Sequence, residues 1–201
     1  MKQFTPTEIA DCIRGIQYVY ALKYEIRYEL TRDEKDFTES VAEHVFGMQV
    51  LADFFLGYDD ANGNLDHAKI HELITWHDVD EIETGDIIGW KKTDDDRANE
   101  ARAAERVIQN LPEILKNKIL KLLQEYEEQK TEEAKFVKAI DKIEPMFHLY
   151  NEEGKAWAKN VGLTHDDSLR IKIPYVNYFP HIKQFNDYFH EMMQKEGYFA
   201  E

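Results

Sequence analysis

Hydrophobic residues recur three or four positions apart along most of this chain of 201 residues. That spacing is typical of helices that bury one apolar face. No segment alternates polar and apolar residues over a useful length for a strand. The pattern predicts an all-α fold, with helices over about 7–30, 41–56, 66–84, 97–111, 112–126, 131–148 and 178–197. We expect Pro145 to kink or end its helix, and residues 154–167 to be less regular.

The segment Ile70–Asp86 has the most unusual pattern. Its inward face begins with three aliphatic residues, Ile70, Leu73 and Ile74. The same helical face continues with an imidazole and two carboxylates, those of His77, Asp78 and Glu81. Burying such groups is costly unless something pairs with them, and a divalent metal does so. Thr84-Gly85 then predicts a helix end, which places the polar cluster near the mouth of a pocket.

A second histidine is expected to point inward. Ser40 and Glu43 have the spacing of a capping box, which puts His44 in the first turn of a helix, on its apolar face. From the residues alone, a metal ligand and a hydrogen-bonded core histidine are equally good interpretations of His44 and His77. The second His-Asp pair, His165-Asp166, has no helical stripe around it and is interpreted as a loop or capping pair.

Charge and length narrow the class of protein. The chain has 25 Lys and Arg against 40 Asp and Glu, a net charge of −15, which argues against binding nucleic acid polymers or anionic membranes. The single cysteine, Cys12, excludes an internal disulfide, and neither a signal sequence nor a long apolar run is present. We therefore expect a soluble, cytoplasmic protein with one domain over 1–201.

Three motifs carry a resemblance to a known family. They are ESVAEHVFGM with His44, ITWHDVDEIETGDI with His77 and Asp78, and FVKAIDKIEPM with Asp141. Their order resembles the H…HD…D pattern of HD-domain metal-dependent phosphohydrolases, and most closely the branch of 5′-deoxynucleotidases. The resemblance covers about 16–150, which leaves a helical extension over about 155–201 without a counterpart. It implies that His44, His77, Asp78 and Asp141 bind one divalent ion: Mn, Co, Fe, Ni, Zn or Mg.

The same resemblance implies roles for residues around the metal. Glu81 matches a catalytic acid or base; the alternative is a solvated helix carboxylate. Arg27 matches an arginine that orients the phosphate, with a surface salt bridge as the alternative and Arg32 as the rival. Asp86 and the turn to Gly89 match a turn that contacts the nucleoside; the alternative is a turn that ends the helix and binds no ligand. His67 and His71 are expected on the outer face of their helix rather than at a second metal.

One departure concerns sugar selectivity, because Tyr28 stands where the family often has the tryptophan that helps to select deoxyribose.

The resemblance implies hydrolysis of (deoxy)nucleoside 5′-monophosphates by metal-activated water. Two alternatives remain: hydrolysis of another nucleotide (a triphosphate, an alarmone or a cyclic nucleotide), and metal-dependent nucleotide sensing without catalysis. A homodimer follows by analogy. The C-terminal aromatic residues are interpreted as core packing, with a dimer surface or a pocket lid as alternatives.

Overall fold

The computed structural model describes residues 18, 22, 24–27, 38–60 and 62–200. Over these residues the fold is all-α, as predicted. The helix expected over about 7–30 lies largely outside the described residues, as do Cys12, Tyr28 and Arg32. The helices are α2 (Val41–Asp59), α3 (His67–Trp76), α4 (Glu81–Thr84), α5 (Asp94–Asn110), α6 (Glu113–Glu128), α7 (Glu132–Leu149), α8 (Glu152–Asn160), α9 (His165–Val176) and α10 (Pro180–Glu196).

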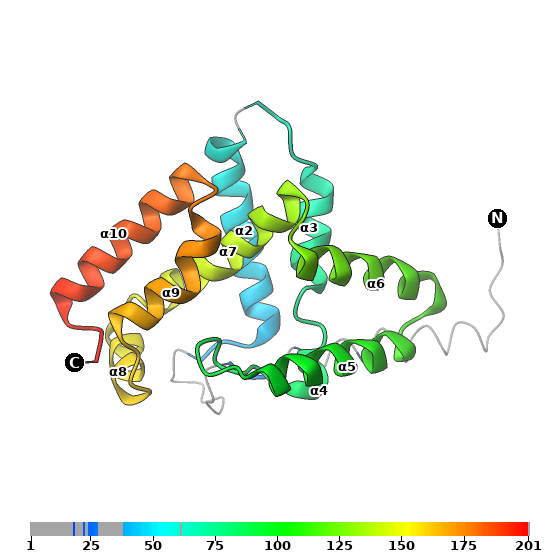
Figure 1. Ribbon diagram of the computed structural model, residues 1–201, viewed down its shortest axis with the longest axis horizontal. Helices are drawn as coiled ribbons and strands as arrows, with labels where there is room; N and C mark the ends of the chain where they lie inside the picture. The colour runs from blue at the N-terminus through cyan, green and yellow to red at the C-terminus, as the bar shows by residue number, and fades with distance from the viewer. Residues whose placement is uncertain (1–17, 19–21, 23, 28–37, 61, 201) are drawn as a thin grey trace.

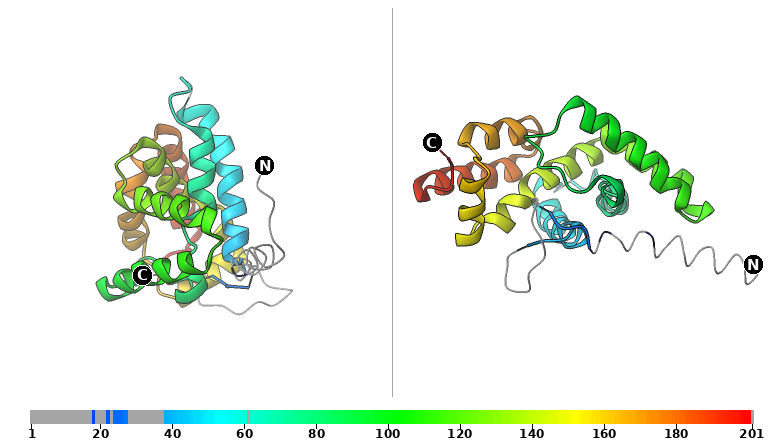
Figure 2. Two further views of the ribbon diagram at one scale, coloured as in Figure 1. Left: turned by 90° about the vertical axis from the view of Figure 1, so that its right-hand side faces the viewer. Right: turned by 90° about the horizontal axis from the view of Figure 1, so that it is seen from below.

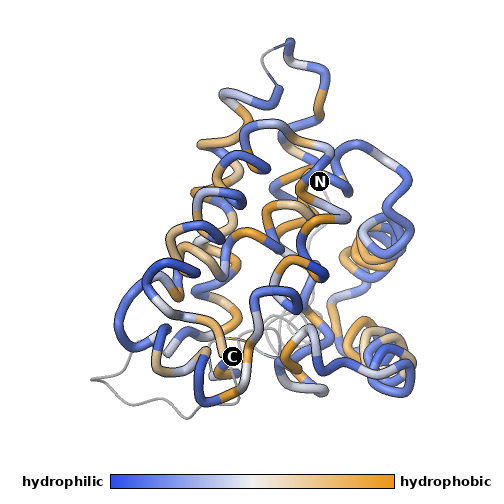
Figure 3. The backbone as a smooth tube through the Cα atoms, turned by 60° about the vertical axis from the view of Figure 1, so that its left-hand side comes forward, coloured by the Kyte–Doolittle hydropathy of each residue, from blue (hydrophilic) through white to orange (hydrophobic). Residues whose placement is uncertain are grey.

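Helix α7 lies at the centre of the bundle (Figure 1). It packs against α2, α3, α6, α8, α9 and α10, so both of its sides are covered. Three of its large apolar side chains, those of Phe136, Ile140 and Ile143, are fully buried. Burial of this kind is the main stabilising contribution in a helical bundle. The other helices carry hydrophobic and hydrophilic stretches in alternation, as expected for elements with one exposed face (Figure 3).

An antiparallel pairing precedes α2. Within the described residues, the one β-bridge joins Ile26 to Ser40 in antiparallel sense. The Arg27 N–H donates to the Glu39 carbonyl at 3.0 Å, and the predicted capping box of Ser40 and Glu43 is formed. This pairing holds the side chains of Arg27 and Glu39 beside the first turn of α2.

The segment Ile70–Asp86 is not one helix, contrary to the sequence prediction. Helix α3 ends at Trp76, and the residues 77–80 form a turn before the short α4. The side chain of His77 gives the reason, because its Nδ1–H donates to the carbonyl of Ile74 at 2.9 Å. In a continued α-helix that carbonyl would accept the N–H of Asp78. The turn leaves His77 and Asp78 at a helix end, as the sequence predicts for the polar cluster.

One further expectation was wrong and another was wrong in part. Helix α7 does not end at Pro145 but continues to Leu149, and a kink at Pro145 stays a prediction. The stretch 154–167 is not irregular, because it contains most of α8 and the start of α9. Asn151 and Thr164 cap these two helices, each accepting a backbone N–H three residues later. His165-Asp166 therefore lies in the first turn of α9.

Helices α9 and α10 lie against α7 on one side of the bundle, whereas α5 and α6 lie on the other (Figure 2). Of the C-terminal aromatic residues, Phe179 and Phe189 are buried, as expected for core packing. Tyr178 and Tyr188 are instead exposed. No helix in the described part of the chain is long and apolar enough to cross a membrane.

Candidate metal centre

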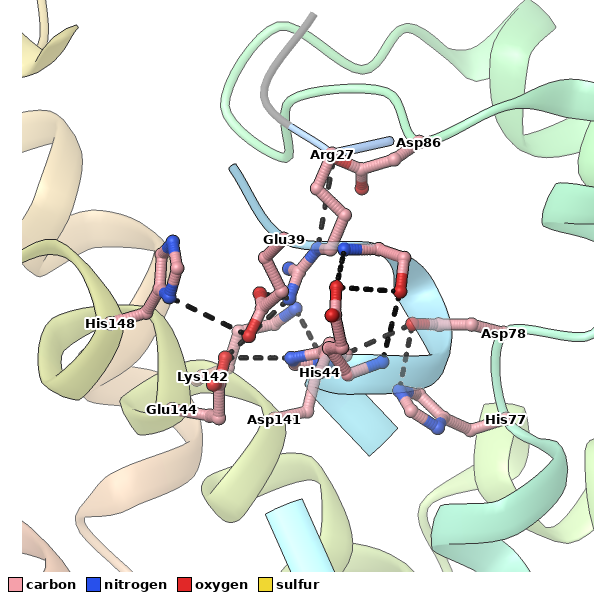
Figure 4. Close-up of polar contacts among 12 residues, drawn as sticks. Arg27, Glu39, His44, His77, Asp78, Asp86, Asp141, Lys142, Glu144 and His148 are labelled. Carbon is pink, nitrogen blue, oxygen red and sulfur yellow. Dashed lines mark hydrogen bonds and ion pairs between the residues drawn. The ribbon is translucent and has the colours of Figure 1, made fainter. Parts of the chain in front are cut away.

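Three separate parts of the chain bring His44, His77, Asp78 and Asp141 together (Figure 4). His44 comes from the first turn of α2, His77 and Asp78 from the turn after α3, and Asp141 from the middle of α7. His44 Nε2 lies 3.6 Å from Asp141 Oδ1 and 3.8 Å from Asp78 Oδ2. His77 Nε2 lies 2.9 Å from Asp78 Oδ2. One atom of each of His44, His77 and Asp78 falls within 4.8 Å of the others, the spacing of ligands around one ion.

The imidazole of His44 has a fixed orientation. It is fully buried, and its Nδ1–H donates to Glu144 Oε2 at 2.6 Å. A histidine whose Nδ1 is held by a carboxylate presents Nε2 as a ligand atom, and such a partner usually raises its basicity. Glu144 is one turn further along α7 than Asp141, so one helix supplies a ligand candidate and the group that orients another.

His77 is oriented in the same way by the backbone. Its Nδ1–H is bound to the Ile74 carbonyl, which leaves Nε2 facing Asp78. Nε2 of His44 and Nε2 of His77 are both buried, and neither forms a hydrogen bond with any of the described residues. A buried polar atom without a partner is costly, and a bound cation would satisfy both imidazoles.

The two carboxylate oxygens of Asp141 have different partners. Its Oδ2 accepts hydrogen bonds from the Tyr126 hydroxyl at 2.9 Å and from Lys142 Nζ at 2.8 Å. Its Oδ1 faces His44 Nε2. The arrangement fixes the carboxylate plane and directs one oxygen toward the histidines. Although burial opposes ionisation, Lys142 and His44 hold the pKa of Asp141 well below its usual range.

Electrostatic interactions in the centre favour ionised carboxylates and a protonated His44. Burial disfavours ionised Asp78, yet the imidazoles of His77 and His44 hold its pKa below the usual range. Burial and Arg27 would lower the pKa of His44, but Glu144 and Asp141 raise it to about 9. Carboxylates that hold a proton on a buried imidazole would also attract a divalent cation in its place.

The donor set therefore fits a divalent metal ion: two imidazoles with buried Nε2 atoms and two carboxylates. A second group of potential ligands, Glu39, His44 and Glu144, is less suited to one. The Arg27 guanidinium lies between its two carboxylates, 3.0 Å from Glu39 and 3.5 Å from Glu144. That cation already occupies the position, and His44 meets Glu144 through Nδ1 rather than Nε2.

Arg27 and Glu81 lie beside the centre. Arg27 is 7% exposed, and besides the two glutamates its Nε is 3.9 Å from Asp86 Oδ2. Glu81, the first residue of α4, is also buried, and its Oε2 forms no hydrogen bond with the part of the chain that the structure describes. Burial, together with Asp78 and Asp86, raises the pKa of Glu81 well above its usual range, which favours the protonated carboxyl.

A cavity of about 530 Å³ opens onto these residues. Five of the residues expected at the site line this cavity: Arg27, Asp78, Glu81, Asp86 and Gly89. The structure therefore brings these five residues together. Residues from α7, α8 and α9 form another part of its wall. His67 is more than half exposed at its side chain and interacts with Asp60, away from the centre, as expected.

Several residues of the centre were not assigned a role from sequence. The sequence shows that Glu144 shares a helical face with Asp141. That position alone does not distinguish Glu144 from the other carboxylates of the chain. Glu39 stands within the motif that contains His44, and it holds Arg27 through an ion pair. Tyr126 is recognised only through its contact with Asp141, since nothing in the pattern of α6 distinguishes it.

Comparisons with known proteins give the family. The 5′-deoxynucleotidase HDDC2 of Mus musculus is 32% identical over 137 residues, which are 67% of this chain and 66% of that protein. The protein of the same name from Xenopus laevis is 36% identical over 108 residues, 53% of this chain and 51% of its own length. The chain thus spans half to two thirds of these relatives.

The fold matches a solved structure over the whole chain. A predicted metal-dependent phosphohydrolase from Magnetospirillum magnetotacticum MS-1 superposes with a TM-score of 0.83 at 24% identity, covering 100% of both chains. The HD-domain family model matches residues 19–183, past residue 150, where the resemblance was expected to end. Most of the presumed extension is therefore part of the family's pattern, and this chain belongs to the HD-domain family.

Proposed function

We propose that this protein is a divalent-metal-dependent phosphohydrolase that removes the 5′-phosphate from (deoxy)nucleoside monophosphates. One observation carries the proposal: two buried imidazoles, whose Nε2 atoms form no hydrogen bond within the described residues, face two carboxylates at the edge of a cavity. His44, His77, Asp78 and Asp141 would hold the ion. Family membership supports a phosphohydrolase, and the relatives named 5′-deoxynucleotidase support the substrate class.

A bound divalent ion supplies Lewis-acid chemistry, since it lowers the pKa of a water molecule and offsets the charge of a phosphate. The protein's part is to orient the phosphate and to move the proton. Arg27 is suited to the first task, because Glu39 and Glu144 hold its guanidinium in place at the cavity wall. A fixed guanidinium binds phosphate oxygens in defined geometry and spends little side-chain entropy on binding.

Glu81 is suited to the second task. Its buried carboxyl lies on the cavity wall close to the charge of Asp78, and it favours the protonated form. A protonated carboxyl can donate to the oxygen that leaves with the nucleoside, and the resulting carboxylate can accept a proton from water. Asp86 and Gly89, in the turn that lines the cavity, are placed to contact the nucleoside.

The test is phosphate release from a panel of deoxy- and ribonucleoside 5′-monophosphates, with triphosphates included. Each substrate is assayed with Mg, Mn, Co and Zn, and again with the Asp78→Asn variant. Metal-dependent release from monophosphates that disappears in the variant supports the proposal and gives the sugar preference. Release from triphosphates alone would assign another nucleotide substrate. Metal binding without release from any substrate would favour the sensor hypothesis.

A further inference from the structure

Three lysines line one wall of the cavity. Lys138 and Lys142 lie one turn apart on α7, and Lys172 lies on α9, which packs against α7. We call these three residues the lysine wall. Their proximity is unexpected in a chain with a net charge of −15, where basic residues are in the minority. Like charges gathered at a cavity repel one another, so the arrangement is costly unless an anion binds there.

Lys172 is the clearest case. Its side chain is buried, with 5% of the residue exposed, and it makes no ion pair with any carboxylate of the described residues. Its ammonium has one hydrogen-bond partner there, Ser168 Oγ at 3.3 Å. Burial and the charge of Lys142 lower the pKa of Lys172 to about 7. A buried ammonium has three N–H groups, so two remain for a ligand.

The single bond of Lys172 is part of an ordered chain. His190 Nδ1–H donates to the Asn186 carbonyl at 2.8 Å, which makes Nε2 an acceptor. The Ser168 hydroxyl, 3.0 Å from that nitrogen, donates to it and accepts from Lys172. The chain fixes the position of the ammonium without neutralising it, as expected of a side chain that awaits an anionic ligand.

The other two lysines are only partly compensated. Lys138 Nζ lies 4.1 Å from the centre of the Tyr126 ring and, within the described residues, pairs with no carboxylate. Lys142 pairs with Asp141 Oδ2 at 2.8 Å, and that carboxylate faces the metal centre with its other oxygen. Within the described residues, Asp141 is thus the one carboxylate that pairs directly with a lysine of the wall, while Glu127 and Asp78 act on Lys138 at longer range.

We propose that the lysine wall binds a second phosphate of the ligand, next to the phosphate at the metal centre. The inference rests on the proposed function and changes its preferred substrate from a monophosphate to a nucleotide with two phosphate groups, either a 5′-diphosphate or a 3′,5′-bisphosphate. A phosphate suits the wall better than a carboxylate because it carries up to two negative charges and three acceptor oxygens. Lysine is a common point-charge partner of phosphate.

Binding without turnover tests the wall by itself. Inorganic pyrophosphate is titrated calorimetrically into chelator-treated protein, so that neither metal nor catalysis contributes. The double variant Lys138→Met/Lys172→Met should bind it about tenfold or more weakly, as expected for the loss of charge-assisted hydrogen bonds. Lys159→Met, which removes an exposed lysine of α8 outside the cavity, is the matched control and should bind as the unaltered protein does. Equal affinity in the double variant would overturn the proposal.

Kinetics separate the two proposals. In the unaltered protein, kcat/KM for a nucleoside 5′-diphosphate or 3′,5′-bisphosphate should exceed that for the monophosphate, and the ratio should fall about tenfold in the double variant. Hydrolysis of monophosphates with no such preference would overturn the proposal that the lysine wall binds a second phosphate, and it would leave the proposed phosphohydrolase activity standing. If the double variant loses pyrophosphate binding but the unaltered protein hydrolyses no nucleotide, the phosphate site at the lysine wall is supported and the phosphohydrolase proposal is rejected. Should the double variant fail to fold, Lys138→Met, at a half-buried position, carries the same comparisons.

Discussion

Glu144 Oε2 accepts a hydrogen bond from His44 Nδ1 at 2.6 Å across the core between α7 and α2. Because this bond directs Nε2 of His44 toward Asp78 and Asp141, we expect Glu144→Gln to weaken divalent-metal affinity by about 10- to 100-fold. The measurement is a titration with Mn or Co in competition with a chelator. Glu132→Gln, at an exposed carboxylate on the same helix, should leave the affinity unchanged. Equal affinities in the two variants would show that Glu144 does not support the centre.

Gly47 offers an independent test of the same contact. A Cβ at this position would lie 2.9 Å from Oε1 of Glu144, whose other carboxylate oxygen, Oε2, interacts with His44 and Arg27. A Cβ at Gly57 of the same helix would meet no atom of the described residues within 4 Å. Gly47→Ala should therefore displace Glu144 and reduce metal affinity several-fold. Gly57→Ala should leave the affinity unchanged and add about 0.5–1 kcal/mol to the free energy of unfolding, since alanine favours a helix. If the two variants bind metal equally well, Glu144 moves aside without effect.

Metal binding should stabilise the folded chain. At a hundredfold excess over the dissociation constant, an ion contributes about 2.7 kcal/mol, or a rise in Tm of roughly 5–10 °C for a chain of this size. We expect this rise in the unaltered protein and its loss in Asp78→Asn, as measured by thermal unfolding with and without metal. Asp166→Asn provides the control, because Asp166 belongs to the other His-Asp pair and is fully exposed. A metal-dependent rise in Tm that persists in Asp78→Asn would show that Asp78 does not bind the metal ion.

Glu81→Gln distinguishes an enzyme from a sensor. The amide keeps the size of the side chain but cannot transfer a proton, so phosphate release should fall by about 10²- to 10⁴-fold. Metal affinity, measured on the same sample, should be retained. Glu83→Gln, two residues later in α4 and outside the cavity, should have the unaltered rate. Full activity in Glu81→Gln would assign the proton transfer to another group.

Stability should depend on pH through His190. Burial lowers the pKa of His190 to about 4, and Lys172 and His165 contribute in the same direction against the opposing effects of the Asn186 carbonyl and Asp187. The unfolded chain binds a proton near pH 6.5 and the folded chain does not, so stability decreases as the pH falls from 6.5 toward 4. Between pH 7 and 5 the loss should be about 1–2 kcal/mol.

The measurement is the difference in Tm between pH 7 and pH 5 for the unaltered protein and for His190→Gln, which retains a polar side chain near Ser168. The variant should lose less stability on acidification. An identical pH dependence in both proteins would mean that His190 is protonated as easily in the folded as in the unfolded state.

The sequence pattern predicts what is encoded locally. The capping box before α2 and the inward position of His44 follow from neighbouring residues, and the structure has both. The end of α3 at Trp76 depends on a side-chain bond from His77 to its own helix, which periodicity does not register. Asp141 could be selected only through the resemblance, because nothing on α7 itself separates it from other carboxylates.

Helix α9 was missed for a related reason. Its buried face is formed by Ser168, Lys172 and Val176, so it shows little of the hydrophobic stripe that identifies a helix. The caps Asn151 and Thr164 were readable in the sequence, but a cap without a following stripe is a weak signal. The lysine wall and the partners of Arg27 arise from contacts between distant segments, and they become visible only once the chain is folded.

The cavity draws its walls from stretches of chain that are far apart. The metal-ligand candidates all lie between residues 44 and 141, whereas Lys172 lies on α9. Exchange of the α8–α9 region between homologues would therefore alter which molecules are accepted and leave the reaction centre intact. Substitutions in α9 can thus change the part of ligand preference that depends on Lys172 without altering any metal-ligand candidate.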